Sequence, residues 1–209
     1  MKHILCFGDS LTWGYKPEDA KRFSFDIRYP GVLQAQLGSQ YKIIENALPG
    51  RCTIYDHPRL KYRNGRDFLL ATLATHQPID LVILLLGTND VQYSVDKSAR
   101  GAAAGCSALI DDILISQARQ DLSAPQILLL SPPHIIKPSN MMGLFFEGSE
   151  EESHKFAKYY EVVAKGFNVP FLDTSKIVKP SPIDGIHLDE KGNYDLGVAV
   201  ADVVKGIMG

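Results

Sequence analysis

The segment Leu81–Leu86 is the longest unbroken apolar run in the sequence. A strand with this pattern presents apolar side chains on both of its faces, so both faces must be buried. Strands of this kind occur in parallel sheets that are covered by helices on each side. Four further runs have the length of a strand: Ile4–Phe7, Tyr41–Ile44, Gln126–Leu130 and the weaker Val169–Leu172. The sequence therefore predicts a five-stranded parallel sheet.

Longer stretches with helix-like amphipathic patterns alternate with these strands. They are Gly31–Leu37, Asp67–Thr75, Lys97–Gln120, Glu150–Lys165 and Glu190–Ile207. Strands that alternate with helices form right-handed crossovers, which place helices on both faces of the sheet. We therefore predict an α/β fold, namely a three-layer α/β/α sandwich with the flavodoxin-like strand order 2-1-3-4-5. A chain of 209 residues without repeats is expected to form a single domain over residues 1–209.

Charge and composition restrict the partners of the protein. The 22 Lys and Arg residues nearly balance the 24 Asp and Glu residues, so no basic excess is present to neutralise nucleic-acid phosphates. No apolar stretch approaches the roughly 20 residues that span a bilayer, and the N-terminus turns polar at Asp9 before a signal-peptide core develops. The three cysteines cannot all pair with one another and are expected to be reduced thiols. We expect a cytoplasmic protein that binds neither nucleic acid nor membranes.

Ser10 directly follows the first predicted strand, in Gly8-Asp9-Ser10-Leu11. Ligands of doubly wound sheets bind beyond the carboxyl ends of the strands, so this is a position at which chemistry is expected. A serine here can cap a helix, or it can act as a nucleophile if a base is at hand. The phosphate-binding motif G-x-x-x-x-G-K-[ST] does not fit, because no lysine stands at the required position. The G-x-S-x-G motif of α/β-hydrolases is absent from the chain.

His187 is the candidate base for such a serine. Asp184 precedes it by three positions across Gly185, in a loop that leads into the last predicted helix. A turn of this kind can bring the carboxylate back onto Nδ1 of the imidazole, which leaves Nε2 free to accept a proton. The remaining histidines lack this arrangement, and we expect them to be structural or solvent-facing: His3, His57, His76, His134 and His154.

Asn89 follows the most buried predicted strand, in Gly87-Thr88-Asn89-Asp90, so its position should be rigid. Its side-chain amide can donate a hydrogen bond to a developing oxyanion, as can the backbone N–H groups of Gly50 and Ser10. Turn chemistry alone also favours asparagine and aspartate after a strand. On these residues alone, both interpretations of Asn89 remain open.

In combination, three segments resemble conserved blocks of the GDSL/SGNH hydrolase family in their order and spacing over nearly the full chain. They are Gly8-Asp9-Ser10-Leu11, Gly87-Thr88-Asn89-Asp90 and Asp184-Gly185-Ile186-His187, which are similar to blocks I, III and V. Within the family, the chain is most similar to the bacterial arylesterase/acyltransferase group. The segments that carry this narrower resemblance run from Leu5 to Gly14 and from Phe146 to Gly148.

The resemblance implies a role for each residue. Ser10 would be the nucleophile, His187 the general base and acid, and Asp184 its orienting carboxylate. The oxyanion hole would consist of the Ser10 N–H, the Gly50 N–H and the Asn89 side-chain amide. Block II departs from the family pattern, because Ala47 stands where a glycine is usual and Pro49 precedes Gly50. The path of this loop is therefore left open.

We expect a serine esterase that hydrolyses small aryl or alkyl carboxylic esters through an acyl-enzyme, without a metal or an organic cofactor. Acyl transfer to an alcohol is the nearest alternative, because Trp13 can make the entrance apolar. A non-catalytic binding module on the same fold is the alternative from another class of protein. The presence of Ser10, Asn89 and His187 argues against it. We expect four side chains to contact the ester: Leu11, Trp13, Phe146 and Ile186.

The segment Met141–Phe146 is nearly all apolar, although it follows a strand and a proline-containing loop. Apolar surface of this kind marks an interface or a ligand groove when it is exposed. Our preferred hypothesis is that it roofs the ester pocket beside Trp13 and Ile186 and packs against a neighbouring subunit. The resemblance supports the resulting expectation of a homo-oligomer. The alternative is that the segment folds back as a local helix onto its own domain.

Overall fold

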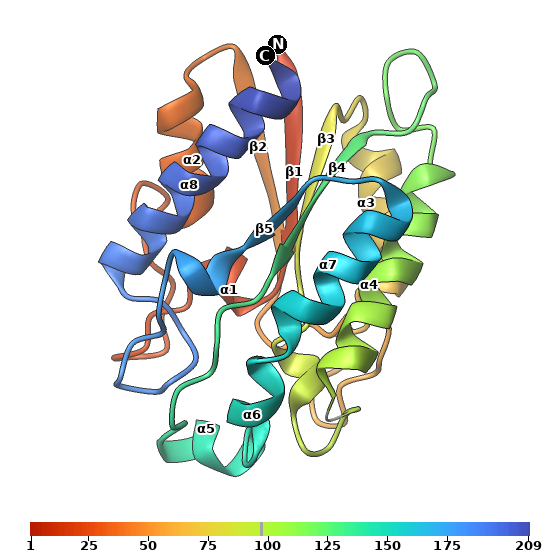
Figure 1. Ribbon diagram of the computed structural model, residues 1–209. Coiled ribbons are helices and arrows are strands. Elements are labelled where there is room, and N and C mark those ends of the chain that lie inside the picture. The colour runs from red at the N-terminus through yellow and green to blue at the C-terminus, as the bar shows by residue number, and fades with distance from the viewer. Residues whose placement is uncertain (97) are drawn as a thin grey trace.

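Five parallel strands form the sheet, in the order β2-β1-β3-β4-β5 (Figure 1). The computed structural model describes residues 1–96 and 98–209. The strands are β1 (Lys2–Gly8), β2 (Tyr41–Ala47), β3 (Leu81–Leu85), β4 (Gln126–Ser131) and β5 (Phe171–Asp173). Gly8 pairs with Ala47 on one side and with Leu85 on the other, so the carboxyl ends of these three strands lie side by side at the same end of the sheet. The predicted fold class and strand order are confirmed.

Helices cover both faces of the sheet (Figure 1). The helices α2 (Tyr29–Leu37) and α8 (Glu190–Met208) lie on one face, and α3 (Arg66–His76), α4 (Ala99–Leu114) and α7 (Phe156–Phe167) lie on the other. All five residues of β3 are buried. Leu81, Ile83 and Leu85 enter the core beneath α2 and α8, whereas Val82 and Leu84 enter the second core. This division explains why the strand is apolar at every position.

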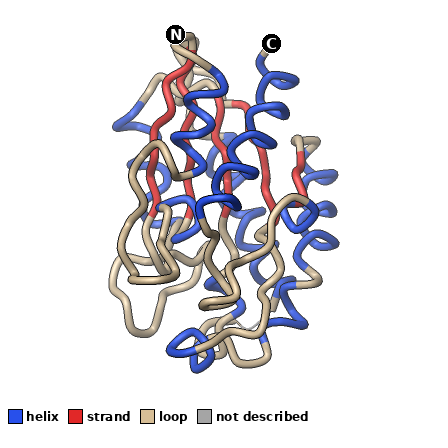
Figure 2. Tube along the Cα trace, turned by 90° about the vertical axis from the view of Figure 1, so that its left-hand side faces the viewer, coloured by secondary structure: helices blue, strands red, loops and turns tan. Residues whose placement is uncertain are grey.

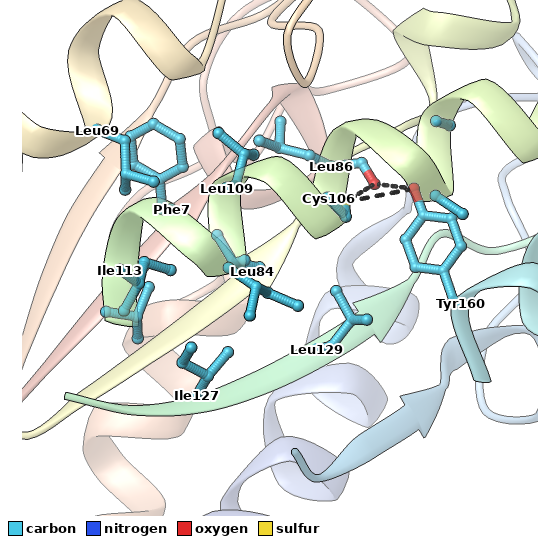
Figure 3. Close-up of a cluster of buried hydrophobic side chains, with 14 of the residues drawn as sticks. Phe7, Leu69, Leu84, Leu86, Cys106, Leu109, Ile113, Ile127, Leu129 and Tyr160 are labelled. Carbon is cyan, nitrogen blue, oxygen red and sulfur yellow. Dashed lines mark hydrogen bonds between the residues drawn. The ribbon is translucent and has the colours of Figure 1, made fainter. Parts of the chain in front are cut away.

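The end of β3 is anchored by the helix layer. The Tyr160 hydroxyl of α7 donates a hydrogen bond of 2.7 Å to the carbonyl oxygen of Leu86, and the Cys106 thiol of α4 approaches the same oxygen at 3.9 Å (Figure 3). Gly87 follows with φ +122°, and a Cβ atom there would lie 2.0 Å from the Tyr160 hydroxyl oxygen. Glycine is therefore required at this position. The hydrogen bond to the Leu86 carbonyl fixes the start of the segment that leads to Asn89.

Two helices differ from the sequence prediction. Helix α4 ends at Leu114 rather than Gln120, because the Ser116 N–H and hydroxyl both donate to the Ile113 carbonyl and Gln117 adopts a positive φ. Lys97, the predicted first residue of this helix, lies outside the described residues. The predicted helix Glu150–Lys165 is divided into α6 (Ser149–Ser153) and α7. After Ser153 the Lys155 N–H donates to the Glu152 carbonyl, three residues back, and the Ser153 hydroxyl accepts a hydrogen bond from the Ile135 N–H.

The remaining short elements lie beyond the carboxyl ends of the strands, where the loops gather in Figure 2. They are α1 (Ser10–Trp13), η1 (Asn89–Val91), α5 (Asn140–Phe145), α6 and η2 (Thr174–Lys176). Both termini lie at the opposite end of the sheet, where the strands begin (Figure 1). Among the described helices, none has the length and apolar character needed to cross a membrane.

Candidate active site

Ser10 is the first residue of α1, but it does not cap this helix. The cap is Asp9, whose Oδ1 accepts a hydrogen bond of 2.9 Å from the Leu11 N–H. Because Asp9 satisfies the helix terminus, the Ser10 hydroxyl is available for another partner. Its Oγ lies 2.9 Å from Nε2 of His187, which is 177 residues away in the sequence. The structure therefore brings together the predicted serine and histidine.

The turn that holds His187 is built around Asp184. Oδ2 of Asp184 lies 2.6 Å from Nδ1 of His187, and Oδ1 accepts hydrogen bonds of 2.9 Å from the N–H groups of Ile186 and His187. Gly185 has φ +78°, and a Cβ atom there would lie 1.8 Å from the Ile136 carbonyl oxygen. Glycine is thus required for the turn that returns the carboxylate to the imidazole.

The charge state of Asp184 suits this contact. Burial acts to raise the pKa of Asp184, but the hydrogen bond and charge of His187, together with the two backbone N–H groups, outweigh it and lower the pKa below its ordinary value. An ionised carboxylate accepts a hydrogen bond from the Nδ1–H group of His187 and leaves Nε2 facing the serine hydroxyl. A hydroxyl, an imidazole and a carboxylate linked in this way can turn a serine into a nucleophile.

Tyr15 is a residue of the site that sequence analysis missed. Its ring stacks on that of His187 with centroids 4.0 Å apart and planes inclined by 25°. The stacking covers one face of the imidazole and holds the ring in its plane between Ser10 and Asp184. No periodicity or motif in the sequence signals this role, because the contact joins two loops that are distant in the chain.

The loop around Gly50 forms a tight turn. The Arg51 N–H donates to the Leu48 carbonyl over 3.0 Å, with Pro49 and Gly50 at the two central positions. The φ of +81° at Gly50 matches the second central position of a type II turn, which favours glycine and is commonly preceded by proline. Pro49 is therefore compatible with the loop, and the turn places Gly50 in the wall of the same cavity as Ser10.

The Arg51 side chain holds this loop from within. Its Nη1 donates to the backbone carbonyls of Asn46 at 2.7 Å and Gly8 at 3.1 Å, and its guanidinium lies 4.3 Å from the centroid of the Phe7 ring. The side chain is almost fully buried. These contacts connect the ends of β1 and β2, so the Gly50 turn has a fixed position relative to Ser10.

Asn89 opens η1, and its buried amide has partners on both sides. Nδ2 donates to the Arg51 carbonyl at 3.0 Å and makes a longer contact of 3.4 Å with Oδ2 of Asp9. Oδ1 accepts a hydrogen bond of 2.9 Å from Nε2 of Gln92. The amide is thus fixed in orientation, and Asn89 lines the cavity together with Ser10, Gly50 and His187.

This cavity has a volume of about 160 Å³. Phe146 and Ile186, two of the predicted contact residues, line it. Met142 and Phe145, from the segment that was predicted to roof the pocket, also line it. The lining residues that the sequence did not assign to the site are Tyr15, Pro49, His57, Arg59, Leu60 and Gln92. Most of them belong to loops, where no hydrophobic period reveals which residues face a pocket.

Leu11 and Trp13 are not among the residues that line the cavity. Leu11 is buried in the core formed with α2 and α8. The Trp13 ring lies near that of Tyr15, with centroids 6.4 Å apart, and the Arg22 guanidinium lies 5.1 Å from its ring centroid. Both were predicted to contact the ester because they follow the nucleophile closely in the chain, but neither lines the cavity, and the Leu11 side chain packs into the core instead.

The apolar segment Met141–Phe146 was predicted either to roof the pocket or to fold back onto its own domain as a local helix, and parts of it do each. It forms the local helix α5, and Phe146 is buried in the domain core. Met142 and Phe145 line the cavity, in which Ile186 is also present. Met141 and Leu144 are 59% and 66% exposed.

His57 was expected to be structural or solvent-facing, and the structure places it in the cavity wall. Its Nδ1 accepts hydrogen bonds of 3.2 Å from the N–H groups of Arg59 and Leu60, which shapes this loop. Burial, followed by the charges of Arg59 and Arg63, lowers the pKa of His57. The ring therefore stays neutral at pH 7, with its proton on Nε2.

The chain is similar to known proteins in both sequence and fold. Residues 6–194 match the model of the GDSL-like lipase/acylhydrolase family. No match was found among curated proteins. The native aryl esterase of M. smegmatis is 40% identical with a TM-score of 0.95, and a carbohydrate acetylesterase from Sinorhizobium meliloti is 33% identical with a TM-score of 0.95. In both comparisons 100% of each chain is covered.

A more distant structure shares the fold alone. A member of the lipolytic G-D-S-L family from Veillonella parvula is 14% identical with a TM-score of 0.70, over 98% of this chain and 99% of that chain. Within the described residues, no group of three or more His, Cys, Asp or Glu side chains is placed to hold a metal ion.

The family match over residues 6–194 and the similarity to the aryl esterase over the full chain show what the protein is. The chain belongs to the GDSL-like lipase/acylhydrolase family and is a carboxylic-ester hydrolase.

Proposed function

We propose that this protein is a serine esterase that hydrolyses small aryl or alkyl carboxylic esters through an acyl-enzyme, within one catalytic domain. The observation that carries the proposal is the chain of hydrogen bonds that begins at Ser10 in the cavity wall. It runs from Ser10 Oγ to His187 Nε2 over 2.9 Å and from His187 Nδ1 to Asp184 Oδ2 over 2.6 Å. The esterase relatives and the small cavity support short esters as substrates.

In the first half-reaction, Ser10 attacks the carbonyl carbon of the ester while Nε2 of His187 accepts its proton. The resulting oxyanion receives hydrogen bonds from the Ser10 and Gly50 N–H groups and from Asn89 Nδ2, for which the long contact to Asp9 is exchanged. Collapse of the tetrahedral intermediate transfers the proton from His187 to the leaving alcohol. Asp184 stabilises the imidazolium throughout. Water then repeats these steps on the acyl-enzyme and releases the acid.

A non-catalytic binding module explains the site less well. Binding an ester requires shape and apolar surface, but it does not require a serine and a histidine in hydrogen-bond contact. The buried Asp184 accepts hydrogen bonds from two backbone N–H groups and orients the imidazole. This arrangement serves proton transfer. We also infer a cytoplasmic location, because Cys6, Cys52 and Cys106 are all buried free thiols.

The proposal is tested with 4-nitrophenyl and phenyl esters of increasing acyl length, in the presence and absence of an added alcohol. If a common acyl-enzyme forms, the ratio of new ester to free acid will be the same for both leaving groups, because partitioning occurs after the phenol has left. We expect such a constant ratio, with some product as new ester, since the wall of the cavity includes the apolar side chains Met142, Phe145 and Phe146. A ratio that changes with the leaving group contradicts the acyl-enzyme. Formation of acid alone contradicts acyl transfer.

We further propose that the protein is a homo-oligomer whose contacts include the outer face of α5. Met141 and Leu144 present apolar side chains to solvent there, whereas Phe146 belongs to the core and is not available to a partner. Replacing Met141 and Leu144 with serine is expected to shift the protein to smaller species on a sizing column, because the apolar contact is lost. The control is the double variant Lys2→Ser and Leu114→Ser, whose positions lie far from α5. A wild-type protein that elutes as a 23.1 kDa monomer would contradict the proposal.

A further inference from the structure

Gln92 lies in the cavity wall and donates the hydrogen bond that Asn89 Oδ1 accepts, at 2.9 Å. We propose that Gln92 is a positioning residue that holds the Asn89 amide with its N–H directed at the substrate oxyanion. This inference rests on the proposed function, because it gives Gln92 a role only if Asn89 is an oxyanion donor. Neither the sequence motifs nor the family resemblance pointed to Gln92.

The orientation of an asparagine amide is decided by its hydrogen bonds, since the oxygen and nitrogen ends have nearly the same shape. In the present orientation, Nδ2 faces the Arg51 carbonyl and Oδ1 faces the Gln92 amide nitrogen. A flipped amide would set oxygen against oxygen at Arg51 and nitrogen against nitrogen at Gln92. It would also present a carbonyl, instead of an N–H, to the developing negative charge. Gln92 therefore disfavours the orientation in which Asn89 cannot stabilise the oxyanion.

The local backbone explains how Gln92 reaches Asn89. Side chains at positions i and i+3 of a 3₁₀ helix lie above one another, and η1 spans Asn89–Val91 with Gln92 as its C-terminal cap. The Gln92 N–H donates to the Asn89 carbonyl at 3.3 Å, and the Gln92 carbonyl accepts from the Val95 N–H at 3.1 Å. With its backbone held on both sides and its side chain only 3% exposed, Gln92 has little freedom to move away.

The side-chain oxygen Oε1 of Gln92 is also buried. Among the described residues, Oε1 has no hydrogen bond of normal geometry. Burial and the charges of Arg59 and Arg63 lower the pKa of the neighbouring His57, and the interaction of His57 with Gln92 acts to raise it.

Because Gln92 also borders the cavity, direct contact with the substrate is the competing role. The two roles differ in the kinetic constant that they affect.

The experiment compares Gln92→Leu with wild type and with Gln36→Leu, a control on the exposed face of α2. If Gln92 positions Asn89, kcat with a short 4-nitrophenyl ester will fall about tenfold, and KM will stay within about twofold, because the lost interaction acts in the transition state. A higher KM with unchanged kcat would mean that Gln92 binds substrate, and the inference would be overturned.

A double-mutant cycle with Asn89→Ala separates this inference from the proposed function. When the Asn89 amide is absent, Gln92→Leu should have almost no further effect on kcat, since it acts through that amide. A full tenfold effect in the Asn89→Ala background overturns the inference but leaves the proposed function intact. If Asn89→Ala itself has wild-type kcat, the proposed role of Asn89 in the oxyanion hole fails, and the inference about Gln92 fails with it.

Gln92→Glu keeps the test decisive if the leucine variant does not fold. A protonated glutamic acid can donate to Asn89 Oδ1, whereas an ionised one cannot. The ratio of the kcat of Gln92→Glu to that of the wild type is therefore expected to rise as the pH falls. A ratio that does not change with pH contradicts a role for Gln92 as hydrogen-bond donor.

Discussion

Replacement of Ser10 by alanine is expected to lower kcat by about 10⁴- to 10⁶-fold, the scale seen when the nucleophile of a serine hydrolase is removed. The alanine has no hydroxyl to attack the ester or to hydrogen-bond with Nε2 of His187, which lies 2.9 Å from Ser10 Oγ. The oxyanion hole and the cavity would remain, so a small residual rate is expected. The measurement is kcat for a 4-nitrophenyl ester, with correction for spontaneous hydrolysis.

Ser39→Ala serves as the matched control, because Ser39 is exposed and lies at the opposite edge of the sheet. A serine-directed phosphonate should label the wild type at Ser10 alone, as located by mass spectrometry of its peptides, and should not label Ser10→Ala. Retention of more than a tenth of the wild-type kcat, a change of less than about 1.4 kcal/mol in the barrier, would refute the proposed nucleophile.

Replacement of Asn89 by alanine is expected to lower kcat by about 10²- to 10³-fold with little change in KM. This is the scale for loss of a single oxyanion donor, whose hydrogen bond strengthens as charge develops on the carbonyl oxygen. The amide is buried and already oriented by Arg51 and Gln92, so it needs no rearrangement when the substrate reacts. The measurement is the separate determination of kcat and KM over a range of ester concentrations.

Asn89→Asp distinguishes the donor from the shape of the side chain. Aspartate has nearly the same volume, but its ionised carboxylate cannot donate a hydrogen bond and would repel an oxyanion. We therefore expect Asn89→Asp to be at least as slow as Asn89→Ala, while circular dichroism shows both to be folded. If only KM changes in either variant, Asn89 is a substrate-binding or turn residue and does not stabilise the transition state.

The amino-acid pattern was informative where burial repeats with the period of an element. The run Leu81–Leu86 indicated a strand covered on both faces, and the structure divides its side chains between two cores. Pattern was less informative at the ends of elements. Glu150–Lys165 has one continuous helical pattern, yet the first helix ends at Ser153, whose hydroxyl accepts a hydrogen bond from Ile135, on a different segment. Such a contact has no counterpart in local sequence.

The sequence by itself determined the layered α/β fold, and the resemblance of three short motifs to a known family predicted that Ser10, Asn89, Asp184 and His187 form the site. The fold could be predicted because strand periodicity is a property of neighbouring residues, and the site residues could be predicted because each motif is a short local segment that resembles a block of the family. Only the tertiary structure decided which other side chains surround them. Tyr15 stacks on His187, and Gln92 is buried in the cavity wall, whereas Leu11 and Trp13 do not line the cavity. These positions depend on how separate loops pack over the sheet edge, where long-range contacts, rather than any local period, determine the direction of each side chain.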